Sequence, residues 1–94
     1  MSKSIMSEER KCYNCGDTRN LHLHHIFFGS ANRKLSDQDG CTVYLCYECH
    51  EGSHGVHGGN RDLDLFLKKA CQREWERRNG TREDFIKRYG KSYL

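Results

Sequence analysis

The sequence predicts a small α+β domain, and three observations lead to this class. Within residues 20–28, positions 21–24 alternate leucine and histidine in the way that a half-buried β-strand alternates its faces. Residues 61–78 carry apolar side chains at helical spacing, and a second helix signal follows them. Only 35% of the 94 residues are apolar, so the core is small and we expect disulfides, a metal or a partner to stabilise it further.

Residues 1–11 are polar and show no apolar periodicity, so we expect a disordered or extended lead-in before a single domain over 12–94. Within that domain, 12–59 holds every histidine and five of the six cysteines, and 60–94 holds the helices. The chain has no apolar run of about 18 residues and no apolar signal-peptide core near its start. We therefore expect a cytoplasmic protein with no membrane partner.

Two Cys-x-x-Cys pairs, separated by about thirty residues, form the most specific motif of the chain. The four residues are Cys12, Cys15, Cys46 and Cys49. Such pairs can present four thiolates tetrahedrally to one zinc ion, and in a reducing compartment they indicate metal binding rather than disulfides. A redox-active pair would need a βαβ context that is absent here. Cys41 and Cys71 lack this spacing, and we expect them to be small apolar core residues.

Six histidines form a second cluster in the sequence. They are His22, His24, His25, His50, His54 and His57. On a strand over 20–28, His22 and His24 share one face and His25 points to the other, so His24 and His25 reach one site only if the chain bends at the strand end. Histidines from this segment and from the segment after Cys49 would leave coordination positions open, as in a catalytic metal site. The alternative is that they are surface residues, which we favour for His22.

The third histidine of such a site has two candidates. His54 would lie one turn after His50 if a helix continued through this segment. His57 is bracketed by glycines, and the glycines of 52–59 each weaken a helix by roughly 0.5–1 kcal/mol relative to alanine. A glycine-bounded turn can fold His57 back toward His50, so we favour His57 and keep His54 as the alternative.

The helix expected over 61–78 has one apolar face. Its apolar residues are Leu63, Phe66, Leu67, Ala70, Cys71 and Trp75. The Asn-Gly pair that follows is typical of a helix end. Thr81 and Asp84 then form a capping signal for a second short helix, which Gly90 ends.

Three segments together resemble the HNH endonuclease family, particularly its short phage and prophage members. They are Leu-His-His-Ile (23–26), Leu-Cys-Tyr-Glu-Cys-His (45–50) and Gly-Val-His-Gly (55–58). The resemblance covers about residues 12–59, and Cys-x-x-Cys pairs on both sides of a His-His-Ile segment are a specific combination. It implies a ββα-metal fold, in which a hairpin and a helix hold one divalent metal. The activity that it implies is the hydrolysis of DNA phosphodiester bonds, in the cytoplasm of a bacterial host.

Carried over residue by residue, the resemblance makes His24 and His50 ligands of the catalytic metal and His25 the general base that deprotonates the attacking water. His57 completes the ligand set, with His54 as the alternative. Imidazole donors suit transition ions, so we expect Mn²⁺, Ni²⁺, Co²⁺ or Zn²⁺ in this site, with Mg²⁺ as a further candidate during turnover.

The chain departs from the family at the middle asparagine of the HNH motif. Cys41 or Thr42 stands near the place where this asparagine usually occurs. Asn32 is the nearby asparagine that could orient the base through its carbonyl, so we assign it this catalytic role as a hypothesis.

DNA is the partner that the resemblance implies, and the net charge of +3 permits a polyanion without arguing for one. Arg33 and Lys34, in the loop of the expected hairpin, and Arg61, near the start of the long helix, are the expected phosphate contacts. The alternative is a merely solvated basic loop. A phage or recombination protein is a further candidate partner, because no recognition helix is evident in the sequence.

Two non-catalytic alternatives stay open at this stage. The chain could be a zinc-ribbon module that binds DNA or a protein, although the extra histidines argue against it. It could also be a structural adaptor of a phage assembly, with the histidines closing a second zinc site. Metal-dependent cleavage of DNA separates the nuclease from both.

Overall fold

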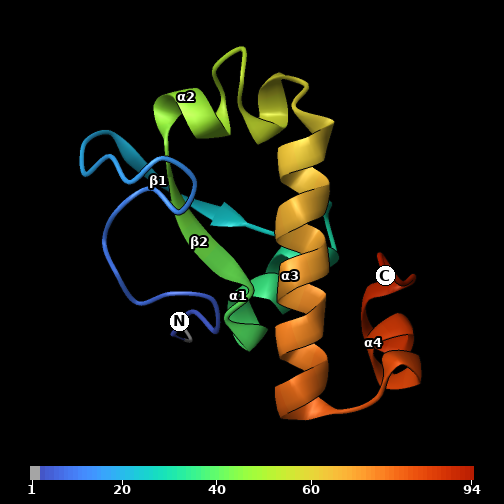
Figure 1. The fold of residues 1–94 in the computed structure, drawn as a ribbon. Helices are drawn as coiled ribbons and strands as arrows, with labels where there is room; N and C mark the ends of the chain where they lie inside the picture. Colours follow the sequence, from blue (N-terminus) through green and yellow to red (C-terminus); the bar gives the residue numbers. More distant parts are fainter. Residues whose placement is uncertain (1–2) are drawn as a thin grey trace.

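Over the described part of the chain, a two-stranded sheet lies beside a long helix, and three shorter helices complete the fold (Figure 1). The computed structural model describes residues 3–94. Its elements are β1 (Leu21–His25), α1 (Asn32–Asp39), β2 (Thr42–Cys46), α2 (Tyr47–His50), the 3-10 turn η1 (Val56–Gly58), α3 (Arg61–Asn79) and α4 (Arg82–Tyr89). The structure confirms the small α+β class.

The two strands pair antiparallel, with Leu21 opposite Cys46 and His25 opposite Thr42. The connection between them is longer than the hairpin loop that we expected, because it contains α1. Ser36 of α1 fixes the helix to the end of β1: its buried hydroxyl donates to the Phe27 carbonyl at 2.6 Å and accepts from the Phe27 N–H at 3.1 Å. This brings α1 next to the last residues of β1.

The predicted C-terminal helices are confirmed almost to the residue. Asn60 caps α3, because its side-chain oxygen accepts from the Leu63 N–H at 3.0 Å. Thr81 and Asp84 form the predicted capping box of α4, and Gly90 ends that helix in a left-handed conformation (φ 98°). Figure 1 shows α3 running alongside the sheet, with α2 and η1 near its start and α4 near its end.

The core joins the sheet to α3 and α4. It includes four of the six apolar residues predicted for the buried face of α3, namely Leu63, Leu67, Cys71 and Trp75. Phe27 meets the Phe85 ring of α4 edge to face and packs against the Tyr89 ring at a tilt. Cys41 and Cys71 are both fully buried, as predicted.

The prediction for Phe66 was wrong, because this side chain is 59% exposed. Two polar residues of α3, Lys68 and Gln72, are buried instead. Lys68 pairs with Asp64 at 2.9 Å, and Gln72 contacts Glu76 at 2.8 Å. These partners make the burial tolerable, since a buried polar group without a hydrogen bond is costly.

Asp39, the last residue of α1, ties three helices together. Its carboxylate accepts hydrogen bonds from Trp75 of α3 at 2.9 Å and from Arg88 and Tyr89 of α4 at 2.6 and 2.7 Å. Burial alone would raise the pKa of Asp39, but these donors outweigh it, and the pKa is lowered. This contact fixes the position of α1 relative to the core.

Residues 3–11 of the expected lead-in are attached to the domain. Residues 3–11 contain no helix or strand, but the Ile5 N–H donates to the Gly40 carbonyl at 2.9 Å. Ile5 and Met6 are partly buried against the core. Within residues 3–94, no helix has the length and apolar character needed to cross a membrane.

Candidate functional site

Four cysteines come together at the start of α2. The sulfur atoms of Cys12, Cys15, Cys46 and Cys49 all lie within 4.8 Å of one another, so they could hold a metal ion such as zinc. The first pair sits on a turn in which the Gly16 N–H donates to the Cys12 carbonyl at 2.9 Å. The second pair spans the end of β2 and the short helix α2.

The thiols of this cluster differ in their electrostatic surroundings. Burial disfavours the Cys12 thiolate, but hydrogen bonds from backbone N–H groups, the strongest from Cys15, outweigh it and lower the pKa of Cys12 to about 6. Burial and the neighbouring thiols raise the pKa of Cys49 to about 12, although Asn14 donates to its sulfur at 3.4 Å. Four thiolates this close together repel one another, and a bound cation would relieve that repulsion.

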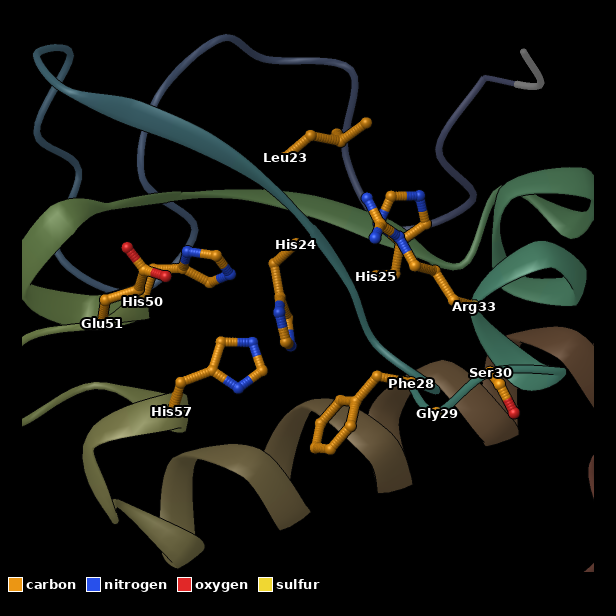
Figure 2. Close-up of a pocket in the computed structure, with 10 residues that line it drawn as sticks. All are labelled: Leu23, His24, His25, Phe28, Gly29, Ser30, Arg33, His50, Glu51 and His57. Atoms are coloured by element: carbon orange, nitrogen blue, oxygen red, sulfur yellow. The ribbon is translucent and has the colours of Figure 1, made fainter.

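Three histidines form a second donor cluster. His24 comes from β1, His50 from the end of α2 and His57 from η1. One ring nitrogen from each lies within 4.8 Å of the others, and the ring centroids are 4.8–5.3 Å apart. Figure 2 shows the three rings converging on a common point.

The turn after α2 places His57 in this cluster, and it can do so only with glycine at two positions. A Cβ atom on Gly58 would lie 1.9 Å from the Gly52 carbonyl oxygen, and one on Gly55 would lie 2.7 Å from the His50 carbonyl carbon. Both contacts are too short for any other residue. The glycines thus allow η1 to pack directly against the end of α2.

The chemistry of His24 fits a metal ligand. Its side chain is only 1% exposed, and its Nε2 atom has no hydrogen-bond partner among the described residues. Burial, together with charge on His50 and His57, lowers the pKa of His24 to about 3, so the ring is neutral. A buried polar atom left unpaired costs about 1–3 kcal/mol, and a divalent ion shared by the three neutral rings would remove this cost.

His54 lies outside the cluster. Its side chain is exposed, and its backbone carbonyl accepts a hydrogen bond from the Asn60 side chain at 2.9 Å. Of the two candidates for the third histidine, the structure therefore brings His57 together with His24 and His50.

His25 approaches the same pocket from the other side of β1 (Figure 2). The pocket has a volume of about 430 Å³. Its lining includes His24, His25, Arg33, His50 and His57. The chain bends where β1 ends, so neighbouring histidines on opposite faces of the strand open onto one cavity.

The partner of His25 is an aspartate that the sequence analysis did not single out. The Nε2 atom of His25 lies 3.4 Å from an Asp37 carboxylate oxygen on α1. Asn32, to which we had assigned the orienting role, instead donates from its side chain to the Tyr89 carbonyl at 3.1 Å. The helical turn of α1 thus directs Asn32 toward α4 and brings Asp37 to His25, which corrects the sequence-based assignment.

The expected phosphate contacts divide into two groups. Arg33 and Lys34 are exposed and border a shallow cavity that His25 and Asp37 also line. Arg61 is exposed at the first residue of α3 and is not among the residues lining the histidine pocket. The basic character of the site therefore comes from α1.

The two donor sets meet at α2, where Cys49 and His50 are consecutive residues. A four-residue helix therefore carries one member of each cluster. No protein-family model, curated protein or solved structure matches this chain. The donor sets and the His25–Asp37 pair are the features from which a function can be inferred.

Proposed function

We propose that this protein is a metal-dependent endonuclease of the HNH, or ββα-metal, type that hydrolyses DNA phosphodiester bonds. The observation that carries the proposal is the convergence of His24, His50 and His57 at a pocket that His25 also lines. A purely structural metal site would be closed by a fourth protein ligand, whereas a catalytic site keeps a position open.

The three converging histidines would hold the catalytic ion. Neutral imidazoles favour Mn²⁺, Ni²⁺, Co²⁺ or Zn²⁺ over Mg²⁺, which prefers oxygen donors. When bound, such an ion supplies Lewis-acid polarisation of the phosphate and stabilises charge on the leaving oxygen. The burial of His24 keeps its ring neutral and therefore available as a ligand.

His25 would act as the general base. Imidazole is the side chain used most often for proton transfer near neutral pH. If the Nε2–H group of His25 donates to Asp37, the Nδ1 atom is left with a lone pair that can accept the proton of an attacking water. Asp37 would then hold the ring in this tautomer and orientation.

Arg33 and Lys34 would bind the DNA backbone on either side of the reacting phosphate. Both side chains are exposed and lie on the helix that also carries Asp37. Basic side chains give affinity that does not depend on sequence, through contacts to phosphates and the release of counterions. We therefore propose low intrinsic sequence specificity.

The four cysteines would bind a structural zinc ion. In a domain this small, metal binding contributes directly to the free energy of folding. Because Cys49 precedes His50, the ion would also fix the short helix that presents His50 to the pocket.

The proposal is tested with the zinc-loaded, full-length protein and supercoiled plasmid, in separate reactions with Mn²⁺, Ni²⁺, Co²⁺ and Mg²⁺. We expect nicking or linearisation with at least one transition ion and loss of most of it in His25→Ala. If the protein binds DNA but none of these ions supports cleavage, the nuclease proposal is rejected and the zinc-ribbon alternative is favoured.

A further inference from the structure

The second ring nitrogen of His50 has a partner outside the proposed ligand set. Its Nδ1 atom lies 3.0 Å from the Nδ1 atom of His22 on β1. The two rings meet edge to face, with centroids 5.1 Å apart and an interplanar angle of 85°. His22 is thus in direct contact with His50, although its sequence position alone favoured a surface role.

This contact determines which nitrogen of His50 is free. A neutral imidazole has one N–H donor and one lone pair. If Nδ1 of His50 donates to His22, the lone pair of His50 is on Nε2, and Figure 2 shows a ring nitrogen of His50 pointing toward His24. His22 must then accept with its own Nδ1 and carry its proton on Nε2.

We propose that His22 is a positioning residue that fixes the tautomer and orientation of His50 as a metal ligand. The inference rests on the proposed metal site of His24, His50 and His57. A ligating histidine commonly donates its other N–H to a fixed acceptor, and loss of that acceptor typically weakens metal binding 10- to 100-fold.

His22 is itself held in place. Its ring meets Tyr47 edge to face, with centroids 6.2 Å apart. On β1, His22 precedes His24 by two residues and therefore shares its face of the strand. The strand thus supplies both a ligand and the acceptor for a second ligand.

The same contact has a competing explanation, because His22, His50 and Glu51 could together hold an ion of their own. In that arrangement His50 would bind one ion through each nitrogen, so its ring would have to lose its only N–H proton. The hydrogen bond requires no such deprotonation, and it uses the donor and the acceptor that two neutral rings already offer.

The experiment compares three variants of the zinc-loaded protein without DNA. His22→Leu removes the acceptor, His22→Asn keeps an oxygen near the position of Nδ1, and His54→Leu is the matched control at an exposed histidine outside the cluster. Co²⁺ is titrated by calorimetry and by its visible absorption, with thermal unfolding as the check on folding.

We expect one histidine-bound Co²⁺ per chain, with affinity reduced about 10- to 100-fold in His22→Leu, largely restored in His22→Asn and unchanged in His54→Leu. The Co²⁺ absorption spectrum should change in His22→Leu, because the His50 ring is no longer held in one orientation. Equal affinity in His22→Leu and the wild type would overturn the proposal. A second histidine-bound ion that disappears in His22→Leu would also overturn it and make His22 a ligand.

Plasmid cleavage by the same proteins separates this inference from the proposed function. If the wild type binds Co²⁺ and the His22 variants follow the expected order, the positioning role stands even when no ion supports cleavage. If the wild type cleaves DNA while His22→Leu keeps full Co²⁺ affinity, the nuclease stands and the positioning role falls.

Discussion

The Nε2 atom of His25 lies 3.4 Å from the carboxylate of Asp37, so the end of β1 and the helix α1 meet at the proposed general base. The contact joins the last residue of a strand to a helix within the strand connection. In the proposed mechanism, Asp37 takes the orienting role that the sequence analysis assigned to Asn32 as a hypothesis.

Replacing Asp37 should slow cleavage without removing the catalytic metal. In Asp37→Ala the His25 ring loses its partner, and we expect kcat to fall by less than the roughly 10²–10⁴-fold that a general base contributes. Metal affinity should stay at the wild-type value, because Asp37 is outside the histidine cluster. Single-turnover cleavage and Mn²⁺ titration measure the two quantities, and unchanged cleavage in Asp37→Ala would refute the positioning of His25 by Asp37.

His25 and His24 are adjacent but should behave differently. His25→Ala should retain the metal and lose most cleavage, by about 10²–10⁴-fold, because only proton transfer is removed. His24→Ala should weaken metal binding itself, since one of its ring nitrogens belongs to the three-histidine cluster. If His25→Ala loses the metal and His24→Ala keeps it, the two roles are reversed.

Replacing one cysteine of the zinc cluster should destabilise the whole domain. In Cys46→Ser we expect a marked fall in thermal stability and loss of tightly bound zinc, because the ion contributes folding free energy. Cys71→Ser, at a buried cysteine outside the cluster, is the control for burial alone and should keep its zinc. Metal analysis and thermal unfolding test this, and a normal zinc content in Cys46→Ser would contradict the assignment.

The Asp39 contact predicts a pH-dependent contribution to stability. Its lowered pKa means that the ionised carboxylate stabilises the fold at pH values above its ordinary pKa of 3.8, and that this stabilisation is lost as the pH falls through the folded-state pKa. Asp39→Asn should cost about 1.5–3 kcal/mol at neutral pH, the range for a hydrogen bond to a charged group.

Urea unfolding at several pH values measures this difference. The wild type and Asp39→Asn should converge in stability at strongly acidic pH, whereas Glu83→Gln, at an exposed position of α4, should change the free energy of unfolding by no more than about 0.5 kcal/mol. A destabilisation of Asp39→Asn that is the same at every pH would show that the carboxylate charge is not responsible.

Local signals in the sequence were sufficient for the C-terminal helices and for the four-cysteine cluster, whereas the family resemblance pointed to His24 and His50. Apolar spacing and the Thr81–Asp84 capping box predict α3 and α4 closely, because these are interactions within about one turn of helix. The glycines around His57 correctly excluded a helix running from His50 to His54.

The parts that the sequence did not predict depend on tertiary contacts. Helix α1 is polar, and its position depends on Ser36 bonding to Phe27 and on Asp39 bonding to α3 and α4. Without α1 in place, nothing in the sequence connects Asp37 to His25. Likewise, His22 and His50 are 28 positions apart, and only the register of β1 on β2 brings their rings together.

In the proposed function, the ion held by His24, His50 and His57 is the ion that permits DNA cleavage. The most direct measurement is nicking of supercoiled plasmid as a function of Mn²⁺ concentration, recorded beside Mn²⁺ occupancy for the zinc-loaded wild type, His57→Ala and His54→Ala. We predict that nicking and occupancy rise together in the wild type, that both are lost over the same range in His57→Ala, and that His54→Ala keeps the metal and loses activity only moderately. Two results would contradict this role of the ion. One is that His54→Ala loses both metal occupancy and nicking while His57→Ala retains both. The other is that nicking does not follow metal occupancy.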